Sequence, residues 1–372
     1  MNKQEYRELF GKEMNIVSVI GQNGKSTIAH MIHHCYLALE IESAYQTTEE
    51  ILQKIPNKSY EKKVKDVIME IPLLDIKEKK ACYIDFDSLI FTNSGKNAEI
   101  NDNWTMKRPF IALPINKTAI VNIDDEQGVD FCNMTVANTI TYGFSELADI
   151  RGCNIKLSVN KTRFDLYYKG GFICRIEVPY FGYYNLHNML ATISYFVSQG
   201  YEPARIAQLL PELPSLAGRF DTFSTDSQIR IVIDYAKNPD AIAAILTSLK
   251  TVCEGNIITI IGAAGKTSRK TRELIGEIAL SHSKQVIMTS DNPGNEEPQG
   301  IIYDMTKGST RQNYRLCIDR EKAIELALKM AKPKDVVVIL GKGHEKKQLI
   351  NEKEYPFCDK KTAEYLIEKF EI

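Results

Sequence analysis

The segment VSVIGQNGKSTIAHMI, residues 17–32, contains the residue types that bind phosphate groups. A β-rich run is followed by a turn with two glycines, then by a Lys-Ser-Thr triplet and a helix-like segment. In such a loop the glycines let the backbone approach the anion, the lysine reaches the β- and γ-phosphates, and the serine hydroxyl binds Mg²⁺. The helix that follows directs its first N–H groups at the same anion. The sequence therefore predicts a nucleotide site. The alternative is an ordinary strand-turn-helix with a surface lysine.

Two neighbouring features bear on this prediction. The usual phosphate loop has a glycine five residues before its Gly-Lys pair, and this chain has Val19 there. Glu70 lies near the end of the apolar run KVKDVIMEI and could supply a carboxylate to the metal. The alternative for Glu70 is a solvated acid at a strand end.

The elements that must position these residues alternate between short β-branched runs and amphipathic helices, which predicts an α/β fold. The runs NIVSVIG, KVKDVIMEI, ACYIDFDSLIFTN and TAIVNIDDE read as strands. Residues 139–180 alternate as in an antiparallel region with a turn at Lys169-Gly170-Gly171. YNLHNMLATISYFVSQG reads as a helix with Gly200 just after its end.

A domain boundary is predicted at LPELPSLAGRF, where prolines and a glycine interrupt the periodicity. After it, IRIVIDYA, NIITIIGAAG, KQVIMTSDN and DVVVILGKG read as four buried strands that end in small or polar residues. This pattern is typical of a doubly wound sheet, whose ligands gather at the carboxyl ends of the strands. We therefore predict a P-loop domain over residues 1–216 and a Rossmann-like domain over residues 217–372.

Composition argues against a nucleic-acid-binding, a secreted or a membrane-spanning protein. The 372 residues are 44% hydrophobic with a formal net charge of −1, so no electrostatic footprint for nucleic acid or an anionic membrane is expected. The polar start lacks the apolar core of a signal peptide, and no apolar run has the length of a membrane span. Eight cysteines are scattered singly, which predicts a reducing, cytoplasmic setting without a zinc site or disulfide framework.

Read together, the motifs resemble the Mur ligase family, most closely its UDP-N-acetylmuramoyl-dipeptide ligase (MurE) type. GQNGKST is similar to the family's short ATP loop, in which the first glycine is normally missing. The resemblance covers residue 15 to the end and rests on ordered motifs: TTEE, VIMEIPLL, FTN, AIVNIDDE, TYGF with ADI, GYYNLHN, AGRFD, IDYAKNPDA, TSDNPGNEEP and GKGHEKKQ.

The resemblance implies an ATP-dependent, ADP-forming ligase that joins a small-molecule carboxylate to an amino acid through an acyl phosphate. It implies ATP and Mg²⁺ as cofactors, with crowded negative charge balanced by cations. The implied catalytic residues are Lys25, Glu70, Lys107 and Arg219. Ser26, Glu70 and Lys107 are the implied metal-binding residues, Lys107 falling where relatives carry a carbamylated lysine. The alternative for Lys107 is an ordinary surface lysine.

The same resemblance implies two sets of binding residues. The residues implied for the nucleotide are Gly21, Asn23, Gly24, Lys25, Ser26, Thr27, Asn185, Asn188, Arg219, Asp234 and Lys237. The residues implied for the substrates are Thr47, Thr48, Asp291, Asn292, Glu296, Gly341, His344 and Glu345. Helix capping and surface charge are the alternative explanation for the polar residues of the second half.

Several departures from the family pattern concern the acceptor and the second metal. The ATP loop begins about 20 residues into the chain, which leaves no room for the family's UDP-binding N-terminal domain. We therefore expect a non-standard acceptor, or a protein partner that supplies this part. Asn97 and Ala98 replace the family's Asp-His, so the second metal site is in doubt. Pro72 and Leu73 replace two serines after Glu70.

Other departures concern the amine. Lys237 replaces a histidine, and Gly294 replaces the arginine that follows Asp-Asn-Pro in members that use diaminopimelate. GKTS at 265–268 replaces a Gly-Asp-Arg-Asp run, so that two arginines are lost and Lys266 is gained. Diaminopimelate is therefore not expected. Two functions stay open: an active ligase on a non-standard acceptor, and a divergent ATP-binding partner or regulatory subunit without ligase activity.

Overall fold

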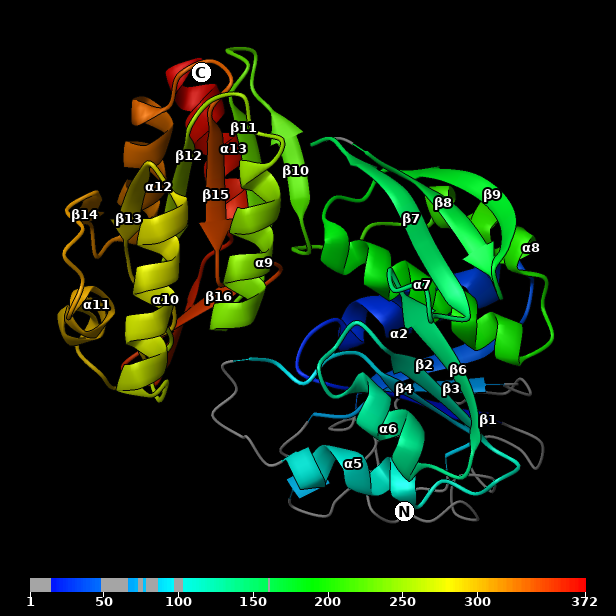
Figure 1. Ribbon diagram of the computed structural model, residues 1–372. Coiled ribbons are helices and arrows are strands. Elements are labelled where there is room, and N and C mark those ends of the chain that lie inside the picture. Colours follow the sequence, from blue (N-terminus) through cyan, green and yellow to red (C-terminus); the bar gives the residue numbers. More distant parts are fainter. Residues whose placement is uncertain (1–14, 48–65, 73–75, 78–85, 97–102, 160) are drawn as a thin grey trace. The chain divides into compact units, whose positions relative to one another are not determined.

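The computed structural model describes residues 15–47, 66–72, 76–77, 86–96, 103–159 and 161–372 (Figure 1). The chain forms two compact units, Met1–Pro214 and Ser215–Ile372, here called the N-terminal and C-terminal units. Their boundary lies two residues before the one predicted from the proline-rich segment. Thr48, Leu73, Asn97 and Ala98, to which predictions are attached above, lie outside the described residues.

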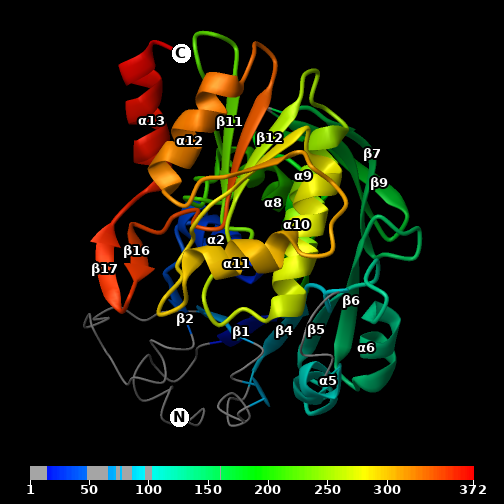
Figure 2. The ribbon, with the colours of Figure 1, turned by 90° about the vertical axis from the view of Figure 1, so that its left-hand side faces the viewer.

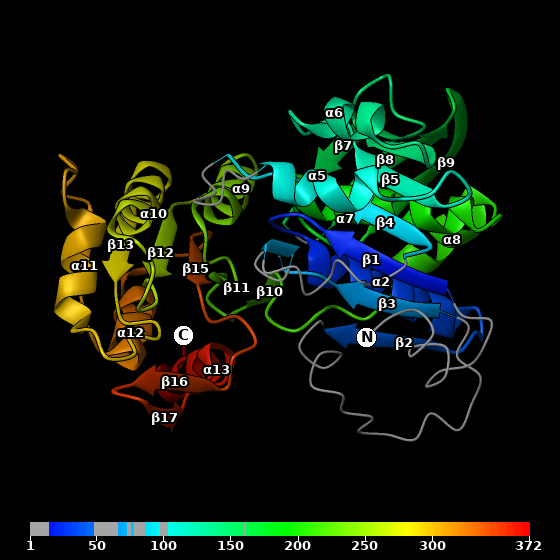
Figure 3. The same ribbon diagram turned by 90° about the horizontal axis from the view of Figure 1, so that it is seen from below.

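The N-terminal unit is built on a mixed sheet. In the described part of the chain it has nine strands in the order β2-β3-β1-β4-β5-β6-β7-β8-β9. The first part of this row, from β2 to β5, can be followed in Figure 3. The strands are β1 Asn15–Ile20, β2 Ser43–Thr47, β3 Asp66–Glu70, β4 Ser88–Phe91, β5 Thr118–Asn122, β6 Asn138–Gly143, β7 Ile150–Leu157, β8 Thr162–Tyr168 and β9 Gly171–Val178. The helices are α2 Lys25–Ala38, α5 Asn103–Ile111, α6 Gly128–Met134, α7 Tyr183–Ser198 and α8 Pro203–Leu209, followed by the short 3-10 helix η1 Leu210–Glu212.

Helices cover both faces of the parallel strands, which explains their continuous apolar sequences. On one face Val17, Val19 and Ile68 pack against α2 and α7. On the other face Ile16 and Ile20 belong to a cluster that includes residues of α5 and α6. These two helices lie on the side of the sheet away from α2 and α7 in Figure 1. Val19 is fully buried inside β1, so the position where a standard loop has its first glycine belongs to the strand here.

The antiparallel prediction for residues 139–180 is correct for β7, β8 and β9 but wrong for β6. β6 pairs in parallel with β5 and with the start of β7. The β8–β9 hairpin turns at Lys169 and Gly170, which have φ values of 46° and 79°. Both values lie in the left-handed region, as a two-residue turn between antiparallel strands requires.

The C-terminal unit has a second sheet, with strand order β10-β11-β15-β12-β13-β14 in the described residues. The strands are β10 Asp221–Ser224, β11 Arg230–Asp234, β12 Ile257–Ile261, β13 Gln285–Met288, β14 Tyr314–Leu316, β15 Val336–Leu340 and, in a separate hairpin, β16 Lys347–Ile350 and β17 Lys353–Pro356. The helices are α9 Pro239–Lys250, α10 Arg269–His282, α11 Pro298–Thr306, α12 Arg320–Met330 and α13 Asp359–Phe370. β11, β15, β12, β13 and β14 are parallel, and β10 joins antiparallel.

Helices lie on both sides of this second sheet, as Figure 2 shows. α9, α10 and α11 pack together on one side, and α12 and α13 pack together on the other. The predicted α/β class with a doubly wound C-terminal sheet is therefore confirmed. Within the described residues, no helix is both long enough and apolar enough to cross a membrane.

Candidate functional site

The predicted phosphate loop joins the end of β1 to the start of α2, and glycine is required at both of its ends. Gly21 and Gly24 have φ values of 141° and 89°. A Cβ at Gly21 would lie 2.0 Å from Thr92 Oγ1, and one at Gly24 would lie 2.5 Å from Asn188 Oδ1. The glycines therefore allow a close approach of the loop to its neighbours.

Asn93, which follows β4, holds the middle of the loop. Its carbonyl accepts the Gln22 N–H at 2.9 Å, and its side-chain oxygen accepts the Asn23 N–H at 3.1 Å. Its side-chain nitrogen donates to the Asn23 carbonyl at 3.1 Å. Asn93 belongs to the FTN motif but was not predicted as a site residue, because its role depends on the pairing of β4 with β1.

Lys25 is the first residue of α2, and its ammonium group folds back over the loop. Nζ donates to the carbonyls of Gly21 at 2.8 Å and Gln22 at 3.0 Å. Thr27, one of the predicted nucleotide ligands, is turned into the interior on the buried side of α2. The positive charge of the loop is therefore carried by Lys25 together with the N-terminal end of the helix dipole.

The structure brings Ser26 of α2 and Glu70 of β3 together. The Ser26 hydroxyl donates to Glu70 Oε2 at 2.6 Å. The Tyr45 hydroxyl, from β2, donates to Glu70 Oε1. A hydroxyl and a carboxylate are hard oxygen ligands of the kind that Mg²⁺ prefers, so this donor set fits the predicted cation. Thr47 pairs with Glu70 in the sheet register.

Asn185 and Asn188 lie in the first turns of α7, and Asn188 borders the loop at Gly24. Asn188 Oδ1 lies against Gly24, as the space around that glycine shows. Asn188 Nδ2 donates to Asn185 Oδ1 at 3.4 Å, and Asn185 Nδ2 donates to the Phe181 carbonyl at 2.8 Å. Asn185 therefore supports the helix start, and Asn188 borders the loop.

Lys107 on α5 forms an ion pair with Asp130 on α6. Nζ lies 2.8 Å from Asp130 Oδ2, with side-chain exposures of 11% and 56%. A carbamate on Lys107 would place a negative charge beside this carboxylate. The geometry gives Lys107 a structural partner, and its expected role as a carbamylated metal ligand stays a prediction. Across the described residues, no three His, Cys, Asp or Glu side chains are grouped to hold a metal ion.

In the C-terminal unit, the ring of Tyr235, which directly follows β11, lies close to side chains from three separate segments of the chain. The Arg219 guanidinium lies 4.7 Å and Lys237 Nζ lies 4.5 Å from the Tyr235 ring centre. The His344 ring lies 4.9 Å from the same ring. Arg219 Nε is buried without a hydrogen-bond partner among the described residues. Arg219, Lys237 and His344, predicted separately, therefore belong to one cluster.

Asp234 ends β11 and is buried below this cluster. Its carboxylate accepts the N–H groups of Phe220 at 2.7 Å and Ala236 at 2.8 Å. Burial raises the pKa of Asp234 to about 6, although Arg219 and the two backbone donors act in the opposite direction. Asp234 thus fixes the backbone on either side of the cluster.

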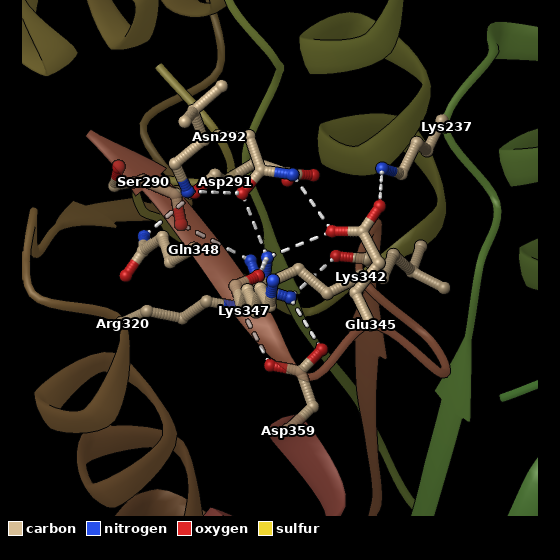
Figure 4. A network of polar contacts seen from close by, with 12 residues as sticks. Lys237, Ser290, Asp291, Asn292, Arg320, Lys342, Glu345, Lys347, Gln348 and Asp359 are labelled. Atoms are coloured by element: carbon tan, nitrogen blue, oxygen red, sulfur yellow. Dashed lines mark hydrogen bonds and ion pairs between the residues drawn. The ribbon is translucent and has the colours of Figure 1, made fainter. Parts of the chain in front are cut away.

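A second network, shown in Figure 4, connects the loops after β11, β13 and β15. Lys237 Nζ donates to Glu345 Oε1, and Glu345 Oε2 accepts from Lys342 Nζ at 3.0 Å and from Asn292 Nδ2 at 2.8 Å. Asn292 Oδ1 accepts from Lys342 Nζ at 2.9 Å and from the Leu349 N–H at 3.0 Å. The side chains of Asn292 and Glu345, predicted to contact substrate, are therefore occupied by protein partners.

These contacts also set the charges of the network. Burial acts to lower the pKa of Lys237, but Asp291 and Glu345 outweigh it, so the pKa is raised. Burial acts to raise the pKa of Glu345, but hydrogen bonds from Lys237 and Lys342 outweigh it, so the pKa is lowered. The Lys237–Glu345 pair is therefore charged near neutral pH. Sequence reasoning did not predict Lys342, which is fully buried.

Asp291 lies beside this network with one oxygen available. Burial raises the pKa of Asp291, and the charges of Arg320, Lys237 and Lys342 act against this shift. Asp291 Oδ1 has no hydrogen-bond partner among the described residues. A Cβ at Gly341 would lie 2.4 Å from Asp291 Oδ2, so glycine at this position leaves the space that the carboxylate occupies. The predicted contact of Gly341 with substrate stays a prediction.

Two further ion pairs of the C-terminal unit, Arg320–Asp359 and Arg272–Glu296, were not predicted from the sequence. Arg320 and Asp359 form a fully buried pair at 2.7 Å, and Arg320 also donates to the Leu340 carbonyl at 2.9 Å. Glu296, predicted to contact substrate, accepts from Arg272 at 2.8 Å and from the Lys266 N–H at 2.7 Å. The carboxylate of Glu296 is thus bound by residues of the C-terminal unit. The sequence carries no local signal for these pairs, because the partners are distant along the chain.

With this geometry in view, both halves match known protein families. The Mur ligase middle domain matches residues 19–196, and the glutamate ligase domain of Mur ligases matches residues 218–343. The UDP-N-acetylmuramoyl-L-alanyl-D-glutamate--2,6-diaminopimelate ligase of Parabacteroides distasonis is 32% identical, with 94% of this chain and 77% of the relative covered. The chain belongs to the Mur ligase family.

Other similarities agree with this assignment. The ligase of the same name from Aquifex aeolicus is 30% identical, with 97% of this chain and 79% of the relative covered. A solved ligase of that name has a TM-score of 0.65 at 24% identity, covering 97% of this chain and 79% of the other. The MurF ligase of Thermotoga maritima in complex with ADP has a TM-score of 0.71 at 16% identity, covering 98% and 82%. These structures share the fold.

As a Mur ligase, the chain is an ATP-dependent amide ligase. The structure places Ser26 against Glu70 and adds Tyr45 and Asn93 as neighbours of the phosphate loop and of Glu70. The predicted residues of the C-terminal unit also gather at the ends of β11, β13 and β15, but several are joined to each other. Which of them contact substrate stays a prediction.

Proposed function

We propose that this Mur ligase activates a small-molecule carboxylate with ATP and joins it to an amino acid, and that neither substrate is the one named for its relatives. The observation that carries the proposal is the Ser26–Glu70 hydrogen bond of 2.6 Å beneath a lysine-containing phosphate loop. It joins a cation-binding oxygen pair to a loop suited to the β- and γ-phosphates of a nucleotide.

The proposed reaction has two steps. The acceptor carboxylate attacks the γ-phosphorus of ATP, which gives an acyl phosphate and ADP. The amine then attacks the acyl carbon, which forms the amide and releases phosphate. Lys25 balances charge on the phosphates that change, and Arg219 is the proposed second cation for the transferring group. Ser26 and Glu70 would hold Mg²⁺, which neutralises the phosphate charge and orients the nucleotide.

The proposed amine site lies in the C-terminal unit. Asp291 supplies an acceptor oxygen that has no hydrogen-bond partner in the described part of the chain, which suits the ammonium group of an amino acid. Asn292, Lys342 and Glu345 hold the loops around it. Loss of the proton from the ammonium group is required before attack, and burial of Asp291 raises its pKa in the direction that favours accepting this proton.

The proposal of a different amine rests on the replacement of the arginines that would bind the distal carboxylate of diaminopimelate. Gly294 stands where the resemblance places an arginine, and a Cβ at this position would meet nothing within 4 Å. Arg272, close by in the fold, is occupied by Glu296 and Asp304. Two guanidinium groups that would bind a distal carboxylate in pairs of hydrogen bonds are therefore lacking. On this basis diaminopimelate is a poor substrate.

The proposal of a different acceptor rests on the strand that carries Glu70. The resemblance places serines after this glutamate, and the chain has the exposed Pro72 there. Proline removes both a side-chain hydroxyl and a backbone N–H from the position. The acceptor is therefore held by other groups, from this chain or from a protein partner.

The test is ADP release by the purified protein with ATP, Mg²⁺, bicarbonate, pooled amino acids and a small-metabolite extract. Mass spectrometry would identify any new amide. We expect ADP release that depends on one amino acid and on one extract fraction, and its loss in Lys25→Ala. ATP binding without turnover in every fraction would contradict the proposal and favour an ATP-binding partner subunit.

A further inference from the structure

The carboxylate of Glu70 is held at both of its oxygens by different elements. Ser26, at the start of α2, donates to Oε2 at 2.6 Å. Tyr45, in the middle of β2, donates its phenol hydrogen to Oε1. A glutamate side chain can otherwise rotate its carboxylate about the last bond, so two donors from two elements fix the plane of the group.

The sheet register explains why Tyr45 reaches this carboxylate. β2 and β3 are parallel, and Thr47 is paired with Glu70, so Tyr45 two residues earlier projects from the same face. That face is covered by α2, and the Tyr45 ring packs against its core, 6.4 Å from the His33 ring. Phenylalanine would fill the same space. The hydroxyl group is therefore the part of Tyr45 that serves Glu70.

We propose that Tyr45 is a positioning residue for the divalent cation of this ligase. It holds Glu70 Oε1, so that Oε2 and the Ser26 hydroxyl are the oxygens presented to the cation. The inference rests on the proposed function, because it assigns the Ser26–Glu70 pair to Mg²⁺. Partners that hydrogen-bond to a metal-binding carboxylate typically change metal affinity or activity by about 10- to 100-fold when removed.

The test uses the full chain and Mn²⁺ as a spectroscopic probe of the Mg²⁺ site. Binding of Mn²⁺ in the presence of a non-hydrolysable ATP analogue is measured by electron paramagnetic resonance for wild type and Tyr45→Phe. We expect the Mn²⁺ affinity to fall by about tenfold in Tyr45→Phe. The matched control is Tyr180→Phe, which removes a phenol hydroxyl that donates to the Leu213 carbonyl at 2.8 Å in the same unit. Its Mn²⁺ affinity should equal that of wild type.

A double-mutant cycle with Glu70→Gln separates positioning from folding. If Tyr45 acts through the carboxylate, Tyr45→Phe should cause little further loss of Mn²⁺ affinity in the Glu70→Gln background. An equal loss in both backgrounds, or an unchanged affinity in Tyr45→Phe alone, would overturn the inference. These results are distinct from failure of the proposed function, in which the wild-type protein itself would bind no Mn²⁺ with the nucleotide analogue and release no ADP.

Discussion

Two loops of this protein have nearly the same sequence pattern and different structures. Residues 20–27, IGQNGKST, and residues 261–268, IGAAGKTS, both read Ile-Gly-x-x-Gly-Lys followed by two hydroxyl residues. Each follows a buried strand, and each precedes a helix of 14 residues, α2 or α10. The two loops therefore separate the effect of the sequence pattern from the effect of the residues around it.

The helix begins at different points in the two loops. In the first loop the residue before the lysine, Gly24, has a φ value of 89°, and α2 begins at Lys25 itself. In the second loop Lys266 itself has a φ value of 65°, and α10 begins three residues later at Arg269. Ser268 caps α10 by accepting the Thr271 N–H. Of these two loops, the first has its lysine within the first turn of the helix, beside the N–H groups that can bind an anion.

The surroundings of the two loops also differ. In the second loop a Cβ at Gly265 would lie 2.2 Å from the Pro293 carbonyl oxygen, so this glycine serves the packing of the chain against itself. Its anion is the protein's own Glu296, which accepts the Lys266 N–H and pairs with Arg272. In the first loop the carboxylate of Glu70 is bound to Ser26, where a cation fits. The sequence pattern predicts a glycine turn in both loops. The proposed function of each turn depends on the carboxylate beside it, Glu70 in the first loop and Glu296 in the second.

The largest contrast is expected when the two lysines are replaced. Lys25→Ala should lower the rate of ADP release by about 10³-fold, because a positive charge next to the transferring phosphoryl group is lost. Lys266→Ala should leave the affinity for an ATP analogue within about twofold of wild type. Isothermal titration with the analogue and ADP-release assays measure both. Equal loss of nucleotide binding in the two variants would remove the distinction between the loops.

Loss of Arg272 should destabilise the second loop. Its side chain is 4% exposed and pairs with Glu296 and Asp304. Arg272→Ala leaves Glu296 without its hydrogen-bonded cation and leaves Asp304 with the exposed Arg269 at 3.9 Å, and we expect a loss of about 3 kcal/mol in the free energy of unfolding. The control is Arg269→Ala, whose side chain is 84% exposed and should change stability little. Urea unfolding measures both, and equal midpoints would contradict the role of Arg272.

The carboxylate of Asp234, at the end of β11, should make the stability of the protein depend on pH. Burial raises the pKa of Asp234 to about 6, above the ordinary value of 3.8. The folded protein therefore binds this proton more tightly, so the stabilisation is complete below about pH 4 and is lost as the pH rises through about 6. The loss amounts to at most about 3 kcal/mol. Asp234→Asn should remove this part of the pH dependence in thermal melts between pH 4 and 7.

Sequence patterns predicted the central strands of both sheets because their buried apolar runs are continuous. Four strands predicted for the second half correspond to β11, β12, β13 and β15, all of them buried. Strands that were missed lie at edges, such as β14 and the β16–β17 hairpin, and they are short and partly exposed. Their formation depends on a neighbouring strand more than on their own sequence.

The candidate site was predictable to a different degree in each unit. Ser26 and Glu70 were identified from types and spacing, and the structure joins them directly. Tyr45 could not be identified, because its partner lies on an adjacent strand 25 residues away. In the C-terminal unit Asn292 and Glu345 were identified, but their partner Lys342 was not. A buried polar network requires the completed fold before its partners can be paired.

The smallest expected effect concerns the backbone of Lys266. A left-handed conformation costs a residue with a Cβ about 1 kcal/mol relative to glycine, and the first loop avoids this cost by having Gly24 at its left-handed position. Lys266→Gly and Lys266→Ala both remove the ammonium group, and only the first relieves the backbone. We therefore expect Lys266→Gly to be more stable than Lys266→Ala by about 1 kcal/mol in urea unfolding. Equal stabilities would mean that the contacts of Glu296 and Pro293 do not hold this position in its left-handed conformation.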